Sequence, residues 1–565
     1  MTTTRATAGD AMRSDAIARA LRAALARAST RTTTKTSREF VGDGDIARFF
    51  EDGGDDDGAS AGVGVGRGRV DVMGGIADYS GATVAQLGLG GRRTECRARF
   101  RDAASGTSGT FRARTVTIGT RGAEEEDARC FEARFDEVFD AETFDAGKTR
   151  EYFERTPSAA NERWAAYVAG AMGEFLRAIS SDADASLKRA RAWVKKLARC
   201  DCEIEIRSDV PQGKGVASSA AVEIAVARAV AASALRAGVV SEDDAARRFS
   251  AHVAMIPLYC QTAENDVVGA PCGFMDQYAC FHSVDSASRG NFIAIDCDLA
   301  NTSHDGAEDI YRLVPLPRKL RVWGIDSGVR HSNSGGSDYA RVRCGTFMGK
   351  KILINEMNAR LNRDVVPSKV DLCGVITARQ WDEGSAGSPM SWSQHVDEEM
   401  TGKSFLARYI SHDDEPNTTI DADSTYTLRA TVSHAVREHA RVREFLSILE
   451  DWPSDDVCAD DDVRQLGRRL GDLMFASHSS YSSVGLGSTA TDDLVRLVRE
   501  VDVERNALFG AKITGGGSGG VVCVLGEDSP SARAAIDAVR REYAKKHSLT
   551  NLPDLLHASH VTDVD

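Results

Sequence analysis

The sequence lacks several features that would mark a distinct class of protein. Its 12 cysteines are scattered through 565 residues without the paired spacing of a zinc site, and Cys200 and Cys202 form a lone Cys-x-Cys pair. Such cysteines indicate free thiols in a reducing compartment. No run approaches the roughly 18–20 continuous apolar residues of a membrane helix. The sequence therefore favours a soluble, cytoplasmic protein that does not act at a membrane.

An excess of basic residues is also missing. The 70 Lys and Arg residues are outnumbered by 84 Asp and Glu residues, which gives a net charge of −14. Nucleic-acid-binding domains usually present a basic face, so this balance argues against nucleic acid as a partner. No internal repeat of fixed period is visible either, which argues against a repeat architecture.

The first 65 residues are expected to lie outside the globular part. Residues 1–38 are rich in Thr, Ala and Arg and resemble an organelle transit peptide, which would direct the protein to an organelle such as a plastid. Alternatively, this segment is a disordered or loosely helical extension. The Asp/Gly-rich tract Glu51–Gly68 predicts a linker, so the globular part is expected to begin near Gly66.

Beyond the linker, short strand-like runs alternate with longer helical patterns. Strands are expected over Arg112–Ile118, Cys202–Arg207, Leu320–Gly324 and Val521–Leu525, and helices over Ala159–Ser181, Val216–Leu235, Glu242–Val267 and Ala340–Leu361. Because there is no regular βαβ repetition, the pattern predicts an α+β fold rather than a doubly wound sheet. Pro315 and Pro317 favour a boundary between two lobes, residues 66–310 and 311–565, with an insertion over 362–426 in the second.

A phosphate-binding loop is predicted at Pro211–Glu223, with the sequence PQGKGVASSAAVE. Gly213 and Gly215 let the backbone approach an anion closely. Ser218 and Ser219 lie where a helix begins, so free N–H groups and hydroxyls stand at its positive end. Ser219 could also reach a magnesium ion. The loop has no Gly-x-x-x-x-Gly-Lys-Ser/Thr pattern, and by composition alone a glycine turn with a serine N-cap explains it as well.

Two carboxylates follow in Cys260–Gln277, at Glu264 and Asp276, on either side of a Gly/Pro turn. Carboxylates placed in this way can converge on one site with different roles. Phosphoryl transfer needs one group to hold magnesium and another to take or orient the proton of the attacking hydroxyl. A solvated turn with two unrelated acidic residues is the alternative.

The order of these motifs resembles the GHMP kinase superfamily. The segment PQGKGVASSAA is similar to its second signature motif, and AKITGGGSGG over Ala511–Gly520 is similar to its third. The resemblance implies an N-terminal lobe like domain 2 of ribosomal protein S5 and a ferredoxin-like C-terminal lobe. It also implies ATP and Mg²⁺ as cofactors, with ATP bound by Gly213, Gly215, Ser218, Ser219, Ala220, Gly515, Gly516 and Gly517.

The galactokinase branch of the superfamily supplies expected roles for single residues. The Cys260–Gln277 segment looks like the one in which a glutamate binds magnesium and an aspartate is the base, so Glu264 with Ser219 is assigned to the metal and Asp276 to the base. The segment GRVDVMGGIADYSG, Gly68–Gly81, resembles the galactokinase opening signature. By that resemblance Arg69 stabilises the catalytic carboxylate and Asp78 binds ring hydroxyls of the sugar, while Gly273, in the carboxylate segment, would offer a backbone contact to the sugar. The stretches Ile325–Ser332 and Gly336–Arg341 are similar to the galactokinase stretch whose tyrosine contacts the sugar, so Tyr339 is a further sugar-binding candidate; a core or surface tyrosine is the alternative.

One departure bears on the sugar. Galactokinases have Glu-His where this chain has Gly75-Ile76, and in that family the pair lies toward the exocyclic hydroxymethyl of galactose. L-Arabinose lacks that group, so loss of the polar pair avoids leaving buried polar groups unpaired. The string DVMGGIADYSG looks like the kinase portion of plant L-arabinokinases. The resemblance implies a sugar 1-kinase acting on L-arabinose; the alternatives are a galactokinase, a uronic-acid kinase and a catalytically inactive sugar sensor.

Overall fold

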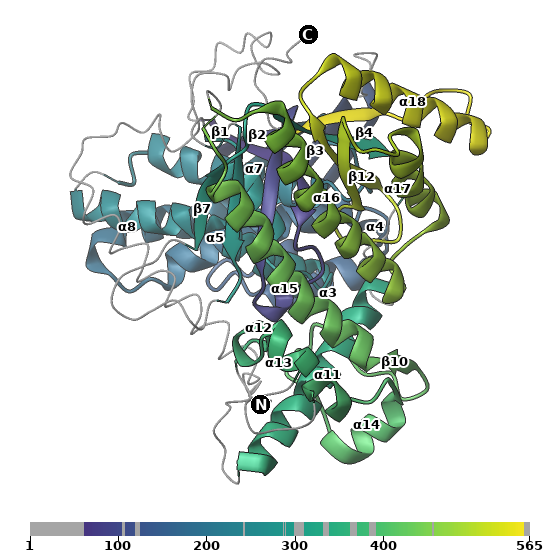
Figure 1. The fold of residues 1–565 in the computed structure, drawn as a ribbon. Helices are drawn as coiled ribbons and strands as arrows, with labels where there is room; N and C mark the ends of the chain where they lie inside the picture. Colours follow the sequence, from purple (N-terminus) through teal and green to yellow (C-terminus); the bar gives the residue numbers. More distant parts are fainter. Residues whose placement is uncertain are drawn as a thin grey trace.

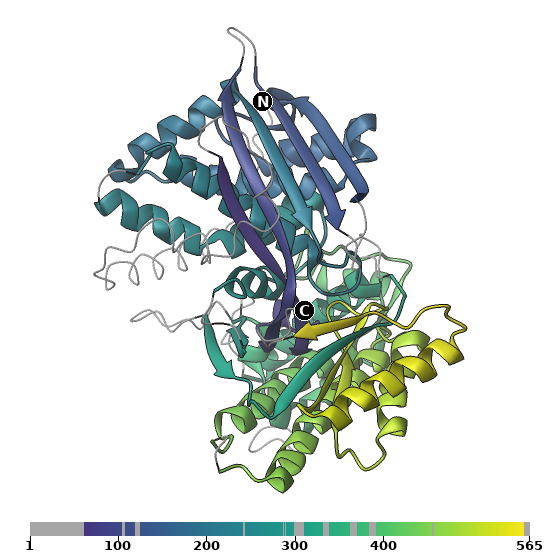
Figure 2. The same ribbon diagram turned by 90° about the horizontal axis from the view of Figure 1, so that it is seen from above.

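The computed structural model describes residues 61–103, 108–118, 125–240, 243–285, 288, 290–298, 310–330, 338–361, 370–383, 391–454 and 457–558. The predicted extension before residue 61 lies outside the described residues. The described strands form one 11-stranded sheet, with an N-terminal and a C-terminal part, and a separate two-stranded sheet. Helices flank them, and the C-terminal elements lie at one end of the long N-terminal strands (Figure 2).

The N-terminal part of the sheet is built around one long strand, β2 (Thr83–Asp102). It pairs antiparallel with β1, β5 and β6, while β3 lies parallel to β5 and antiparallel to β4, and β7 extends the sheet from β6. The remaining bounds are β1 (Gly62–Met73), β3 (Thr110–Ile118), β4 (Glu125–Arg134), β5 (Cys200–Ser208), β6 (Asn291–Asp296) and β7 (Tyr311–Pro315).

Helix α7 (Ser218–Arg236) packs directly on β1 through a stripe of glycines. A Cβ added at Gly62, Gly64 or Gly66 would overlap the α7 backbone, so only glycine permits this close approach. The expected linker over Glu51–Gly68 is therefore wrong from residue 62 onward: these glycines form a strand because the helix above them supplies the packing.

Among the described residues, α7 also has the length and hydropathy of a membrane span. Since 78% of that window is buried, the helix serves here as the central core helix of the N-terminal part, against α5 (Trp164–Ser181) and α9 (Ile256–Ala263). Its apolar character follows from contacts on nearly every side.

The other N-terminal helices are α2 (Phe135–Val138), α3 (Ala146–Arg155), α4 (Pro157–Ala160), α5 (Trp164–Ser181), α6 (Lys188–Lys196), α8 (Asp243–Ala254), α9 (Ile256–Ala263) and α10 (Met275–His282). The expected single helix over Glu242–Val267 is wrong. It is divided into α8, α9 and a π-helical turn at Glu264–Val268, and Pro257 stands at the start of α9. Proline has no N–H for a continuous helix, so the chain restarts there. The helix expected over 159–181 is likewise divided into α4 and α5.

The C-terminal part of the sheet runs β11 (Leu508–Ile513), β12 (Val521–Glu527), β8 (Leu320–Asp326), β13 (Leu555–Ala558). It joins the N-terminal part through the β13–β2 pair, where Ala558 faces Leu89. The helices of this part are α15 (Leu428–Glu450), α16 (Asp460–Ser483), α17 (Thr489–Val501) and α18 (Pro530–Lys546). Helix α16 packs on β11 and against α15 (Figure 1).

The described parts of the expected insertion form a small subdomain at the end of α11 (Asp338–Leu361) and α15. Figure 1 shows α11, α13, α14 and β10 grouped at one end of the molecule. Its elements are α12 (Leu372–Val375), α13 (Ala378–Glu383), β9 (Glu399–Thr401), α14 (Gly402–Tyr409) and β10 (Thr425–Thr427). They enclose a separate apolar cluster that includes Trp381 and Phe405, so the segment is ordered by its own core.

Candidate active site

The expected phosphate loop ends at an uncapped helix. Gly213 and Gly215 adopt φ of 66° and 72°, and Ala217, with φ of 60°, occupies the N-cap position of α7 without a side-chain cap. The serine N-cap considered from the sequence is therefore wrong. Ser218 and Ser219 form the first turn of α7, with Ala220 buried behind them. The first-turn N–H groups of the described α7 are thus available to an anion at the positive end of the helix.

The C-terminal glycine run closes against this loop. Gly515, Gly516 and Gly517 follow β11, and a Cβ at Gly515 would come within 2.7 Å of the Gly215 carbonyl. The N–H of Val521 donates to the carbonyl of Lys214 at 3.0 Å. The structure thus brings together two segments about 300 residues apart that the sequence assigned to one nucleotide site.

Arg69 and Asp276 form an ion pair beside this junction. Both Nε and Nη2 of Arg69 donate to Asp276 Oδ1, at 3.0 and 2.6 Å, and Nη1 donates to the carbonyl of Gly215 at 2.6 Å. Arg69 is 1% exposed, whereas the Asp276 side chain is 30% exposed. Burial opposes the charge on Arg69, but Asp276 and Asp71 outweigh it and raise its pKa. The arginine is a fixed support, and the carboxylate remains open to a ligand.

Asp78 lies next to Gly273, and both residues were assigned to the sugar from the sequence. A Cβ at Gly273 would overlap the Asp78 carboxylate, so glycine is required for the two segments to meet. Burial, with a contribution from Asp276, raises the pKa of Asp78 to about 6. Tyr339 lies in the first turn of α11, one turn before Arg343, and its ring meets Tyr79 edge-on with 6.1 Å between the ring centres. The sugar candidates therefore converge from three separate segments.

Glu264 and Ser219 also meet. The Ser219 hydroxyl lies 3.3 Å from Glu264 Oε1, and Gln277 Nε2 donates to Glu264 Oε2 at 2.7 Å. Burial, together with Asp276, raises the pKa of Glu264 to about 7. Gln277 also donates to Glu223, whose pKa burial and Glu264 raise well above the usual range. Sequence reasoning missed Glu223, although it ends the phosphate-loop segment and lies one helical turn after Ser219.

The donor set fits magnesium shared with a nucleotide. No group of three or more His, Cys, Asp or Glu side chains that could hold a metal by themselves occurs in the described ranges. Mg²⁺ in phosphoryl-transfer sites usually takes only one or two carboxylates, its other ligands being phosphate oxygens and water. A hydroxyl and a carboxylate at the mouth of the phosphate loop, Ser219 and Glu264, match that requirement.

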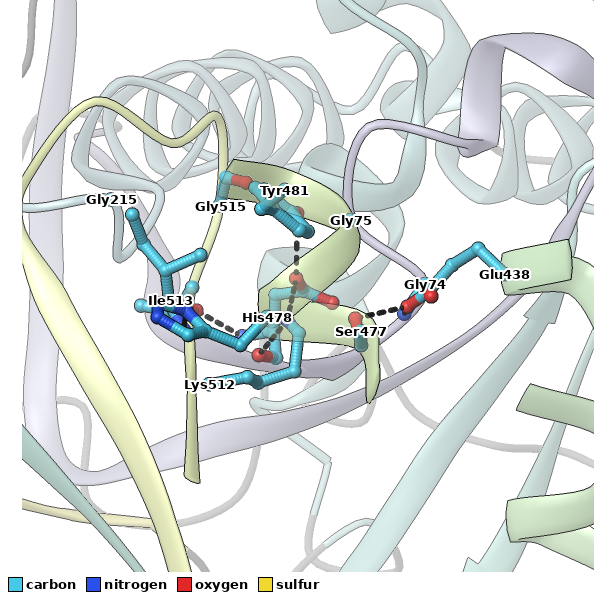
Figure 3. A network of polar contacts seen from close by, with 12 residues as sticks. Gly74, Gly75, Gly215, Glu438, Ser477, His478, Tyr481, Lys512, Ile513 and Gly515 are labelled. Atoms are coloured by element: carbon cyan, nitrogen blue, oxygen red, sulfur yellow. Dashed lines mark hydrogen bonds and ion pairs between the residues drawn. The ribbon is translucent and has the colours of Figure 1, made fainter. Parts of the chain in front are cut away.

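A buried polar network beneath the site was not foreseen from the sequence (Figure 3). Lys512 Nζ lies 2.8 Å from Asp71 Oδ2, and both side chains are fully buried. The Tyr481 hydroxyl donates to the Gly515 carbonyl at 2.9 Å and lies 3.5 Å from Asp71. Both ionic partners stand inside recognised motifs, but nothing in their spacing indicated that they pair. The network joins β1 to the glycine run.

Gly75 and Ile76 lie against the same network. A Cβ at Gly75 would overlap the Tyr481 hydroxyl, so the tyrosine fills the space of a side chain at this position. The Gly75 carbonyl lies 3.1 Å from His434 Nε2, and the Gly74 N–H donates to Glu438 at 3.0 Å. Ile76 is buried in an apolar cluster with Tyr79. Helices α15 and α16 therefore hold the segment that carries Asp78.

Two segments of this chain and its overall fold are similar to known proteins. The family model of the GHMP kinases N terminal domain matches residues 185–283, and that of the GHMP kinases C terminal matches residues 463–545. Lactococcus lactis galactokinase complexed with galactose superimposes with a TM-score of 0.53 at 16% identity, over 88% of this chain and 93% of that chain. This similarity concerns the fold.

Curated relatives agree with the family models. L-arabinokinase of Arabidopsis thaliana is 33% identical over 512 residues, which cover 84% of this chain and 44% of that protein. Galactokinase of Streptomyces lividans is 28% identical over 344 residues, 60% of this chain and 61% of that protein. The chain therefore spans less than half the length of the Arabidopsis relative. Both domain models of the GHMP kinases thus match this chain in order, and the two glycine motifs that lie within or beside the matched segments are in contact.

Proposed function

We propose that this protein is an ATP-dependent sugar 1-kinase that converts L-arabinose to L-arabinose 1-phosphate. The observation that carries the proposal is the position of Arg69, which binds the carboxylate of Asp276 and the carbonyl of Gly215. One side chain thereby fixes the distance between a carboxylate able to receive a proton and the loop able to hold phosphates. Similarity to the Arabidopsis L-arabinokinase supports the choice of sugar.

In the proposed reaction, the anomeric oxygen attacks the γ-phosphorus of ATP. The new O–P bond forms as the bond to ADP breaks, and Asp276 receives or orients the hydroxyl proton. Arg69 keeps the carboxylate in place and provides fixed positive charge near the transferring group. The α7 N-terminus and the glycine run position the phosphates. Positioning and charge neutralisation thus supply most of the catalysis.

Magnesium is proposed as the metal cofactor. Ser219 and Glu264 would hold it, with Gln277 orienting the Glu264 carboxylate. When bound, the ion supplies charge neutralisation at the phosphate oxygens. Glu264 contacts Ser219 in the first turn of α7, whereas Asp276 is held by Arg69. The two carboxylates therefore have environments suited to separate roles.

The buried surroundings of Gly75 support a sugar without an exocyclic hydroxymethyl group. Tyr481 occupies the space beside Gly75, and Ile76 contributes only apolar surface. A hexose would meet no polar partner from these two residues. Galactose and its uronic acid remain the competing substrates within the same reaction class.

The test is ATP turnover on L-arabinose, D-galactose, D-galacturonate and D-glucuronate, with Asp276→Asn as the inactive control. We expect kcat/KM for arabinose to exceed that for galactose, and the variant to lose at least about 10²-fold in kcat. Preference for galactose would keep the kinase and refute the account of Gly75. Saturable sugar binding without turnover of any of these sugars would instead favour a sensor.

A further inference from the structure

Arg343 is a buried cation that the proposed mechanism leaves unused. It lies on α11, four residues after Tyr339, and its side chain is 5% exposed. Its Nε and Nη2 donate to Asp414 Oδ2 and Oδ1 at 2.8 and 2.7 Å. Burial opposes the charge, but Asp414 outweighs it and raises the pKa of Arg343. This two-bond arrangement fixes the plane and direction of the guanidinium.

The third nitrogen, Nη1, has no hydrogen-bond partner among the described residues. A buried guanidinium N–H left without an acceptor costs free energy, and such groups in native structures commonly face a ligand or water. Asp414 has no capacity to spare, because Asn417 and Thr418 also donate to it, at 3.1 and 2.8 Å. Asp414 therefore fixes the direction of Nη1 but has no free acceptor position to offer it.

Arg343 lies among the residues that are candidates for binding the sugar. Its guanidinium carbon lies 5.0 Å from the centre of the Tyr79 ring, next to Asp78 in the chain. Tyr339 lies one turn before Arg343 on α11 and its ring meets Tyr79 edge-on, while Asp78 touches Gly273. Arg343 thus stands where the three sugar-binding segments meet, and its anchor comes from the subdomain between α11 and α15.

From this geometry we propose that Arg343 Nη1 donates a hydrogen bond to a hydroxyl or ring oxygen of the sugar that Asp78 also binds. Because Asp414 already balances its charge, the pair is neutral overall and suits a neutral monosaccharide. A uronate would need a cation that is not already paired. The subdomain between α11 and α15 is therefore part of the sugar site through Asp414. This inference rests on the proposed sugar-kinase function.

The first experiment measures the equilibrium Kd of L-arabinose and of a non-hydrolysable ATP analogue for wild type, Arg343→Met, Arg343→Lys and Asp414→Asn. Arg360→Met is the matched control, since Arg360 lies on the same helix in an exposed pair with Glu356. We expect Arg343→Met to weaken arabinose binding by about 10–100-fold while ATP-analogue binding changes less than about 2-fold. Arg343→Lys should bind arabinose as weakly as Arg343→Met, because an ammonium cannot bind Asp414 and the sugar with separate nitrogens as the planar guanidinium does.

A set of monodeoxy-arabinoses keeps the test decisive if Arg343→Met does not fold. In wild type, removing the hydroxyl bound by Nη1 should weaken binding, and in Arg343→Lys or Asp414→Asn the same deletion should cost much less. Equal losses for every deoxy sugar in all the variants would overturn the proposal, as would unchanged arabinose binding by a folded Arg343→Met. Wild type that binds no sugar would refute the proposed function itself, which is a separate outcome.

Discussion

The buried pair of Lys512 and Asp71 gives the sharpest prediction about how the two parts of the molecule are held together. The residues are 441 positions apart, on β11 and β1, and both are fully buried with 2.8 Å between Nζ and Oδ2. Lys512→Met keeps most of the side-chain volume but leaves the Asp71 carboxylate with Gln86 as its remaining side-chain donor within 3 Å in the described structure.

The magnitude follows from the desolvation of Asp71. Removing one partner of a buried pair typically costs about 3–5 kcal/mol, because the other charge stays buried without compensation. By about 1.4 kcal/mol per factor of ten, this corresponds to opening of the junction that is more frequent by roughly two to three and a half orders of magnitude. Adding Asp71→Asn to Lys512→Met should recover part of the loss, since the uncompensated charge is then gone.

Hydrogen exchange of the β1 and β11 amides, measured by mass spectrometry, tests this locally and needs no two-state unfolding. Arg379→Met is the control, because Arg379 pairs with Glu383 on the surface, with side chains 85% and 66% exposed. Such pairs contribute at most about 1 kcal/mol. If Lys512→Met exchanged no faster than Arg379→Met in these strands, the assignment of the pair as the link between the lobes would be refuted.

Three further predictions concern the site. Arg69→Lys should lower kcat by about 10²-fold with little change in sugar KM, because lysine keeps a charge but cannot bind Asp276 and the Gly215 carbonyl together. Steady-state kinetics test this prediction, and a change confined to KM would contradict it. Gly273→Ala should raise sugar KM by at least about 10-fold by displacing Asp78, whereas Gly173→Ala, whose new Cβ would have 3.5 Å to its nearest neighbour, should leave kinetics unchanged. For Asp78, the folded-state pKa of about 6 exceeds the usual 3.8, so its contribution to folding stability should fall as pH rises from about 4 to about 6. Asp78→Asn should make that slope shallower in thermal melts at fixed ionic strength, whereas an identical slope in the variant would contradict the raised pKa of Asp78.

The local motifs of this protein could be predicted from its sequence because their chemistry depends on neighbours in the chain. Glycines such as Gly213 and Gly215 and serines such as Ser218 and Ser219 favour a loop and a helix start through local geometry, and α7 was expected within two residues of its bounds. The order of the motifs then indicated which loops meet. Helix division at Pro257 was missed, because the apolar pattern continues through it.

Only the tertiary structure decided what lies beneath and beside these motifs. The pairing of Asp71 with Lys512, the contact of Tyr481 with Gly75, and the anchoring of Arg343 by Asp414 join positions far apart in sequence. From sequence alone, a charged residue is expected at the surface, because most charged side chains in folded proteins are exposed. Burial, and therefore the strength and direction of each of these interactions, exists only after distant helices and strands have packed around them.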